Sequence, residues 1–165
     1  MAERGTYDLT FGPGAAVAGR DFTDPAYAAG DVREMTEMLA RERRLAAQWA
    51  ADPDAPASAS LLTHGADGRR HWLAVPNVRN LVEAKDFTCV GFFGHFRDEV
   101  DASPLFELEE MVVNGFPEFA EVGLLSYYDK HLENGRYGNL ILFSTSEPPR
   151  EWFTKNPGHE QAVAI

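Results

Sequence analysis

Five histidines are present in the chain, and histidine is the side chain whose proton affinity best suits acid–base work near neutral pH. His95 lies among phenylalanines in the run FTCVGFFGHFR, where an unpartnered polar side chain would cost about 1–3 kcal/mol. We therefore weigh His95 equally as a pocket residue and as a hydrogen-bonded histidine of the core. For His159 a structural role in a closing helix is favoured. His64, His71 and His131 lie beside expected turns and are expected at the surface.

Tyr127 and Asp129 form a second group of candidates, because the alternation of side chains along a strand places both on one face with His131. If that face lined a pocket, Tyr127 could hydrogen-bond a carbonyl or phenol of a substrate. The simpler alternative is that Tyr127 and Tyr128 flank the sheet, one on each side.

Several kinds of site lack their sequence motifs. No HxH, HxxxH or CxxC spacing occurs, and neither a GxGxxG nor a GxxxxGK[ST] loop is present. A GxSxG motif is also absent, and the single cysteine, Cys89, has no neighbouring base and cannot form an internal disulfide. We therefore expect no metal site, no phosphate-cradling loop and no covalent catalysis by serine or cysteine.

The charge balance excludes two classes of partner. The chain has 165 residues with 15 Lys+Arg against 26 Asp+Glu, a net charge of −11. This charge repels phosphate backbones and anionic membrane surfaces. No apolar run reaches the roughly 18 residues that span a bilayer, and the first ten residues do not resemble a signal peptide. We expect a cytoplasmic protein with neither a nucleic-acid nor a membrane partner.

The first half of the chain predicts an extension. Residues 1–30, rich in glycine and proline, indicate an arm with at most one short strand. Apolar residues at helical spacing predict a helix over 31–49, with Asp31 and Glu34 as its capping box and the charged run 41–44 as its solvated face. A hairpin and a short helix are expected next, with the hairpin strands at 60–64 and 71–75 around Asp67-Gly68 and the helical turns at 77–84.

The second half predicts a ferredoxin-like half-module of order βαββα that lacks its last strand. Its expected strands cover 87–97, 123–132 and 139–144, its helices cover 103–122 and 148–163, and Asn134-Gly135 forms the hairpin turn. We assign 1–71 to the extension and 72–165 to the module, within one structural unit. The first and third strands are apolar on both sides, so the second face must meet the extension or another copy. A homodimer is the economical interpretation.

Three segments of this half resemble the dimeric α+β barrel superfamily, and more narrowly a group of uncharacterised bacterial proteins within it. They are GLLSYY at 123–128, GNLILF at 138–143, and the spacing from Trp152 to His159. The resemblance covers roughly residues 72–163 and implies an α+β fold with a ferredoxin-like antiparallel sheet and helices on one face. Members of the superfamily include cofactor-independent monooxygenases, haem-binding and haem-degrading enzymes, and small-molecule lyases. In the haem-binding members a histidine is the axial ligand.

We therefore expect a small enzyme that acts on an apolar or aromatic molecule, by acid–base or oxygenase-like chemistry of the monooxygenase or lyase type. The candidate catalytic residues are His95, Tyr127 and His159, and the candidate substrate contacts are Phe93, Asp129 and Trp152. One alternative is a non-catalytic dimer or assembly subunit that uses its apolar sheet face as an interface. Another is a haem-binding protein that uses His159 or His95. The sequence itself requires no cofactor.

Overall fold

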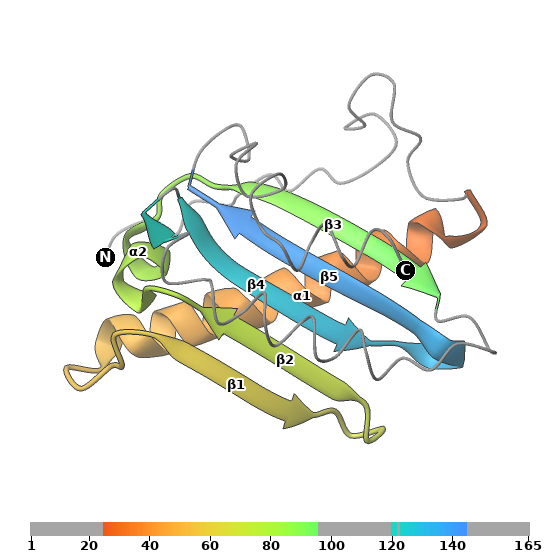
Figure 1. The fold of residues 1–165 in the computed structure, drawn as a ribbon, viewed down its shortest axis with the longest axis horizontal. Coiled ribbons are helices and arrows are strands. Elements are labelled where there is room, and N and C mark those ends of the chain that lie inside the picture. Colours follow the sequence, from red (N-terminus) through yellow and green to blue (C-terminus); the bar gives the residue numbers. More distant parts are fainter. Residues whose placement is uncertain (1–24, 96–119, 122, 145–165) are drawn as a thin grey trace.

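The computed structural model describes residues 25–95, 120–121 and 123–144, which form an antiparallel sheet with two α-helices (Figure 1). The elements are α1 (Pro25–Ala51), β1 (Ala59–His64), β2 (Arg70–Val75), α2 (Val78–Glu83), β3 (Thr88–His95), β4 (Leu124–His131), η2 (Glu133–Gly135) and β5 (Arg136–Phe143). The expected α+β class is confirmed. The expected arm before residue 25 and the helices at 103–122 and 148–163 lie outside the described residues, apart from Ala120 and Glu121.

The sheet has five strands in the order β1-β2-β4-β5-β3, and every neighbouring pair is antiparallel. Strand β5 lies between β3 and β4. The β1–β2 hairpin extends the sheet beyond β4, so β1 and β3 are the outer strands of the described sheet. The boundary between residues 71 and 72 falls inside β2, which pairs with both β1 and β4. The extension and the module therefore share one sheet.

The long helix α1 is confirmed, but it begins at Pro25 rather than at Asp31. Asp31 is therefore not a cap. It lies inside the helix, where it is buried and accepts a hydrogen bond from Arg136. Arg136 is the first residue of β5, which begins three residues earlier than expected.

The expected solvated face of α1 is also partly wrong. Arg43 and Arg44 are exposed, whereas Glu42 is only 1% exposed. Glu42 follows Met38 by four residues and Leu39 by three, which places it on the buried face of the helix.

Both faces of the sheet carry buried apolar side chains, as the strand patterns predict. On one face α1 and α2 pack through Met38, Leu39, Val78 and Leu81 against strand residues such as Leu140. Figure 1 shows α1 running behind the sheet. On the other face a smaller cluster consists of Ala74, Leu124, Ile141 and Phe143. The helices of the described region therefore cover a single face.

The turn residues take the backbone conformations that their sequences predict. Gly68 has a φ of 78° between β1 and β2. Asn134 and Gly135 have φ values of 57° and 69° before β5, as in the hairpin turns that favour Asn-Gly. Neither described helix is long and apolar enough to cross a membrane.

Candidate functional site

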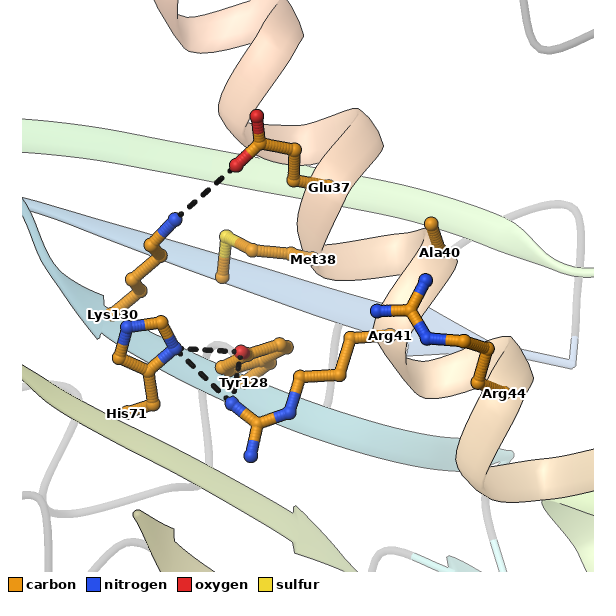
Figure 2. A pocket seen from close by; sticks show the side chains of 8 residues that line it. All are labelled: Glu37, Met38, Ala40, Arg41, Arg44, His71, Tyr128 and Lys130. Atoms are coloured by element: carbon orange, nitrogen blue, oxygen red, sulfur yellow. Dashed lines mark hydrogen bonds and ion pairs between the residues drawn. The ribbon is translucent and has the colours of Figure 1, made fainter. Parts of the chain in front are cut away.

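A cavity of about 360 Å³ lies between α1 and the strands β2 and β4 (Figure 2). We call it the Arg41 cavity, and it is lined by Glu37, Met38, Ala40, Arg41, Arg44, His71, Tyr128 and Lys130. Its volume falls within the range of about 300–1,000 Å³ that is typical of small-molecule pockets.

Arg41 connects three strands to the helix. Its Nη1 atom lies 2.7 Å from the Tyr128 hydroxyl and 3.1 Å from Nδ1 of His71. Its Nη2 atom donates to Oγ1 of Thr63 at 2.7 Å. The guanidinium carbon also lies 5.4 Å from the centroid of the Tyr128 ring, which is a cation–π distance. The side chain is therefore held in one position by α1, β1, β2 and β4.

These contacts assign the proton of His71. A guanidinium only donates hydrogen bonds, so Nδ1 of His71 must accept and the ring proton must lie on Nε2. Burial lowers the pKa of His71, and the charges of Lys130 and Arg41 lower it further. His71 is therefore a neutral imidazole near pH 7, with its Nδ1 lone pair directed at Arg41 and Tyr128.

Tyr128 is the proton donor of this group. Its hydroxyl accepts from Arg41 and lies 3.0 Å from Nδ1 of His71, which makes it a donor toward His71. Burial raises the pKa of Tyr128, and the nearby Arg41 opposes this by favouring the phenolate. The residue is therefore a neutral phenol at neutral pH whose ionised form would lie beside a cation.

The lining of the Arg41 cavity is more positive than the rest of the chain. It has three cationic side chains and one carboxylate, in a chain of net charge −11. Lys130 is neutralised by Glu34 and Glu37, at 2.6 Å and 3.6 Å. Arg44 is exposed, and no residue of the described ranges forms an ion pair or hydrogen bond with it. The cavity therefore favours an anionic group at the Arg44 end.

The expected pair of Tyr127 and Asp129 lies on the opposite face of the sheet. Nδ2 of Asn139 donates to the Tyr127 hydroxyl at 2.9 Å and to Oδ1 of Asp129 at 3.0 Å. Asp129 is 3% exposed and pairs with Arg70 at 2.9 Å, and Nε2 of His131 lies 3.9 Å from its carboxylate. Tyr127 and Tyr128 do flank the sheet, one on each side.

None of the other expected site residues within the described ranges lies on the same face of the sheet as Tyr127 and Asp129. Phe93 packs against the cluster beneath α1, and its ring lies over Gly138. His95 is exposed at the end of β3 and shares the face of Phe93 by strand alternation. The sheet therefore separates Phe93 and His95 from Tyr127 and Asp129. His159 and Trp152 lie outside the described residues.

The sequence interpretation missed the residues that line the cavity. His71 was expected at the surface, and this is wrong because the ring is half-buried and bonded to Arg41 and Tyr128. Strand alternation could have predicted this, because His71 shares a face of β2 with Leu73 and Val75, both of which face the core. Arg41 was assigned to the solvated face of its helix, although it follows the buried Met38 by three residues.

Within the described ranges, no group of three His, Cys, Asp or Glu side chains is arranged to hold a metal ion. Comparison of the chain with protein-family models, with curated proteins and with solved structures found no match.

Proposed function

We propose that the chain is a small-molecule enzyme that binds an anionic compound with an apolar or aromatic body in the Arg41 cavity and donates a proton to it from Tyr128. One observation carries this proposal. A single guanidinium nitrogen of Arg41 lies within hydrogen-bond distance of both the Tyr128 hydroxyl and Nδ1 of His71. The three side chains therefore form one connected, fixed proton-donating group inside a ligand-sized cavity.

The chemistry follows from the protonation states. Without a ligand, the hydroxyl proton of Tyr128 is directed at Nδ1 of His71. With a ligand, the hydroxyl rotates toward a ligand oxygen, its O–H bond breaks, and a new O–H bond forms on the ligand. The resulting phenolate is stabilised by the Arg41 cation and is reprotonated from solvent. His71 stays neutral throughout, because a second proton would place three cations side by side.

The lining supports a substrate with two different ends. The exposed Arg44 supplies a cation for a carboxylate. Met38 and Ala40 add apolar side chains to the lining. A small aromatic or branched aliphatic carboxylate has this distribution of charge and apolar surface.

We also propose that residues 72–163 belong to the dimeric α+β barrel superfamily. The position of β5 between β3 and β4, antiparallel to both, supports a ferredoxin-like arrangement. Within that superfamily we favour acid–base chemistry over oxygenase-like chemistry or haem binding, because the cavity brings a proton donor and its partners together.

The proposal is tested by ligand-induced stabilisation of the purified protein with benzoate, phenylacetate and 3-methylbutanoate. A compound at ten times its Kd stabilises the folded state by about 1.4 kcal/mol. This corresponds to a Tm increase of roughly 3–6 °C for a domain of this size. We expect Arg44→Gln to lose most of the increase, whereas Arg43→Gln, its exposed neighbour on α1, should retain it.

Turnover is tested separately by following the bound compounds with proton NMR. Any compound that the wild type consumes should bind to Tyr128→Phe but react at least about 100-fold more slowly. Stabilisation that is equal in wild type and Arg44→Gln would contradict the anion end of the site. Unchanged turnover in Tyr128→Phe would contradict the role of Tyr128.

A further inference from the structure

We propose that two copies of this chain associate through β1, with the two β1 strands antiparallel about a two-fold axis at Leu62. The two sheets would then form one continuous sheet. This inference is independent of the proposed function, because the Arg41 cavity lies between α1 and the strands β2 and β4 and plays no part in it.

The phase of the β1–β2 hydrogen bonds shows which backbone groups of β1 point outward. The amide of Gly65 donates to the carbonyl of Arg69, and the register continues from this pair through Thr63 opposite His71. Because bonded and non-bonded pairs alternate in an antiparallel ladder, Ala59, Leu61 and Thr63 bond to β2. The N–H and C=O groups of Ser60, Leu62 and His64 therefore point away from β2.

On that side, β1 is the outermost strand of the described sheet (Figure 1). An outer strand with a row of unpaired N–H and C=O groups is a template for another strand. Natural proteins protect such edges with lysine, proline or a bulge. The sequence of β1, ASLLTH, contains neither residue, and its pairing with β2 runs without a register shift.

The edge is complementary to itself. Antiparallel pairing about Leu62 places this residue opposite the partner's Leu62, and it places Ser60 opposite the partner's His64. Each of these pairs exchanges two backbone hydrogen bonds, because their polar groups all point outward. No lysine, arginine, aspartate or glutamate occurs in β1, so no like charges meet across the axis despite the net charge of −11.

An exposed apolar side chain, Leu62, lies on the same edge. Leu62 is 59% exposed, and Phe92, at 38%, is the other exposed large apolar side chain of the described residues. Leu62 lies opposite Trp72 on β2, and Trp72 is held there by the hydrogen bond from its Nε1 to Oγ of Ser60 at 2.9 Å. Pairing would bury Leu62 against the partner's Leu62, and each Leu62 would still have Trp72 as its neighbour on β2. These observations favour a second copy of the chain over an unrelated strand.

Paired charge substitutions at Leu62 provide the test. We expect sedimentation equilibrium of the full chain to show a dimer for the wild type. Leu62→Lys alone and Leu62→Glu alone should each raise the dimer dissociation constant by about 100-fold or more, because each places two like charges on the axis. An equimolar mixture of the two variants should restore the dimer, because the lysine of one chain then lies opposite the glutamate of the other. Gln48→Lys, which adds the same charge at an exposed position of α1, should leave the wild-type dimer unchanged.

Three results would overturn the proposal. The first is a wild type that stays monomeric up to millimolar concentration. The second is a dimer that Leu62→Lys leaves intact, which would place the interface elsewhere. The third is slow hydrogen exchange at the amides of Ser60, Leu62 and His64 in a monomer, which would mean that another segment of the same chain covers this edge. Circular dichroism of each variant separates loss of association from loss of folding.

Discussion

Glu42 of α1 accepts a hydrogen bond from Ser126 of β4, with 2.8 Å between Oε2 and the serine Oγ, although both side chains are fully buried. Its Oε1 atom has no hydrogen-bond partner in the described part of the chain. Burial raises the pKa of Glu42 to about 8, and the hydrogen bond from Ser126 opposes this only in part. Glu42 is therefore a largely protonated acid at pH 7, buried between helix and sheet.

This buried acid predicts that the protein loses stability as the pH rises. The pKa of Glu42 is about 8 in the folded state and near its ordinary value of 4.5 in the unfolded chain. Between these values the folded state binds the proton and the unfolded state does not, so the free energy of unfolding falls with increasing pH. The contribution is complete below pH 4.5 and is lost by about pH 8. Urea denaturation at pH 5, 6.5 and 8 would measure a decrease of the order of a few kcal/mol.

The variant Glu42→Gln isolates the contribution of this residue. It keeps the shape and the hydrogen bond from Ser126 but has no proton to lose, so we expect it to be about 1–3 kcal/mol more stable than wild type at pH 8. At pH 5 the two should be nearly equal. Glu83→Gln, which changes an exposed carboxylate of α2, is the matched control and should follow the wild type at both pH values. A parallel pH dependence in Glu42→Gln and wild type would contradict the buried acid.

The contact between Arg41 and His71 predicts coupled titrations. Burial, Lys130 and Arg41 together lower the pKa of His71, so replacing Arg41 by Met should raise that pKa toward its ordinary value. The same change removes a cation that favours ionisation of Tyr128 and should raise the pKa of Tyr128 further. NMR titration of the His71 ring and the ultraviolet absorbance of tyrosinate would measure the two shifts. Arg43→Met, an exposed control on the same helix, should move neither.

On the other face of the sheet, the ion pair between Asp129 and Arg70 predicts a large loss of stability when the carboxylate is neutralised. Asp129 is buried and accepts from both Arg70 and Asn139. Asp129→Asn leaves the guanidinium without its carboxylate and should cost roughly 3 kcal/mol of unfolding free energy. Adding Arg70→Met should cost less in the Asp129→Asn background than in wild type, because the unpaired cation is removed. Strictly additive costs in a double-mutant cycle would exclude the coupling, and the exposed Glu133→Gln should change stability by less than about 0.5 kcal/mol.

The elements of the described region were predictable from local patterns. The hairpin at Asp67-Gly68 and the turn at Asn134-Gly135 carry strong signals, because few residues tolerate a positive φ. Alternation along β4 correctly placed Tyr127 and Asp129 on one face. These features depend on neighbours in the sequence, which a single chain displays directly.

The cavity depends on which elements lie side by side, and local patterns do not specify this. Arg41 and Tyr128 are 87 residues apart and meet only because β2 pairs with β4 and α1 crosses both. Glu42 was assigned to solvent by its charge, whereas its spacing from Met38 and Leu39 placed it in the core. In both cases helical periodicity was more informative than side-chain polarity.

Gly68 and Gly30 have different backbone conformations, so replacing each by alanine should change the stability in opposite directions. Gly68 has a φ of 78°, where a side chain is strained, so Gly68→Ala should cost about 1–2 kcal/mol. Gly30 lies inside α1, and a Cβ built there meets no atom within 4 Å. Gly30→Ala should therefore stabilise the folded state by about 0.5–1 kcal/mol, because alanine loses less backbone entropy in a helix than glycine. Thermal unfolding of both variants beside the wild type would measure the signs, and a destabilising Gly30→Ala would show that α1 does not continue through residue 30.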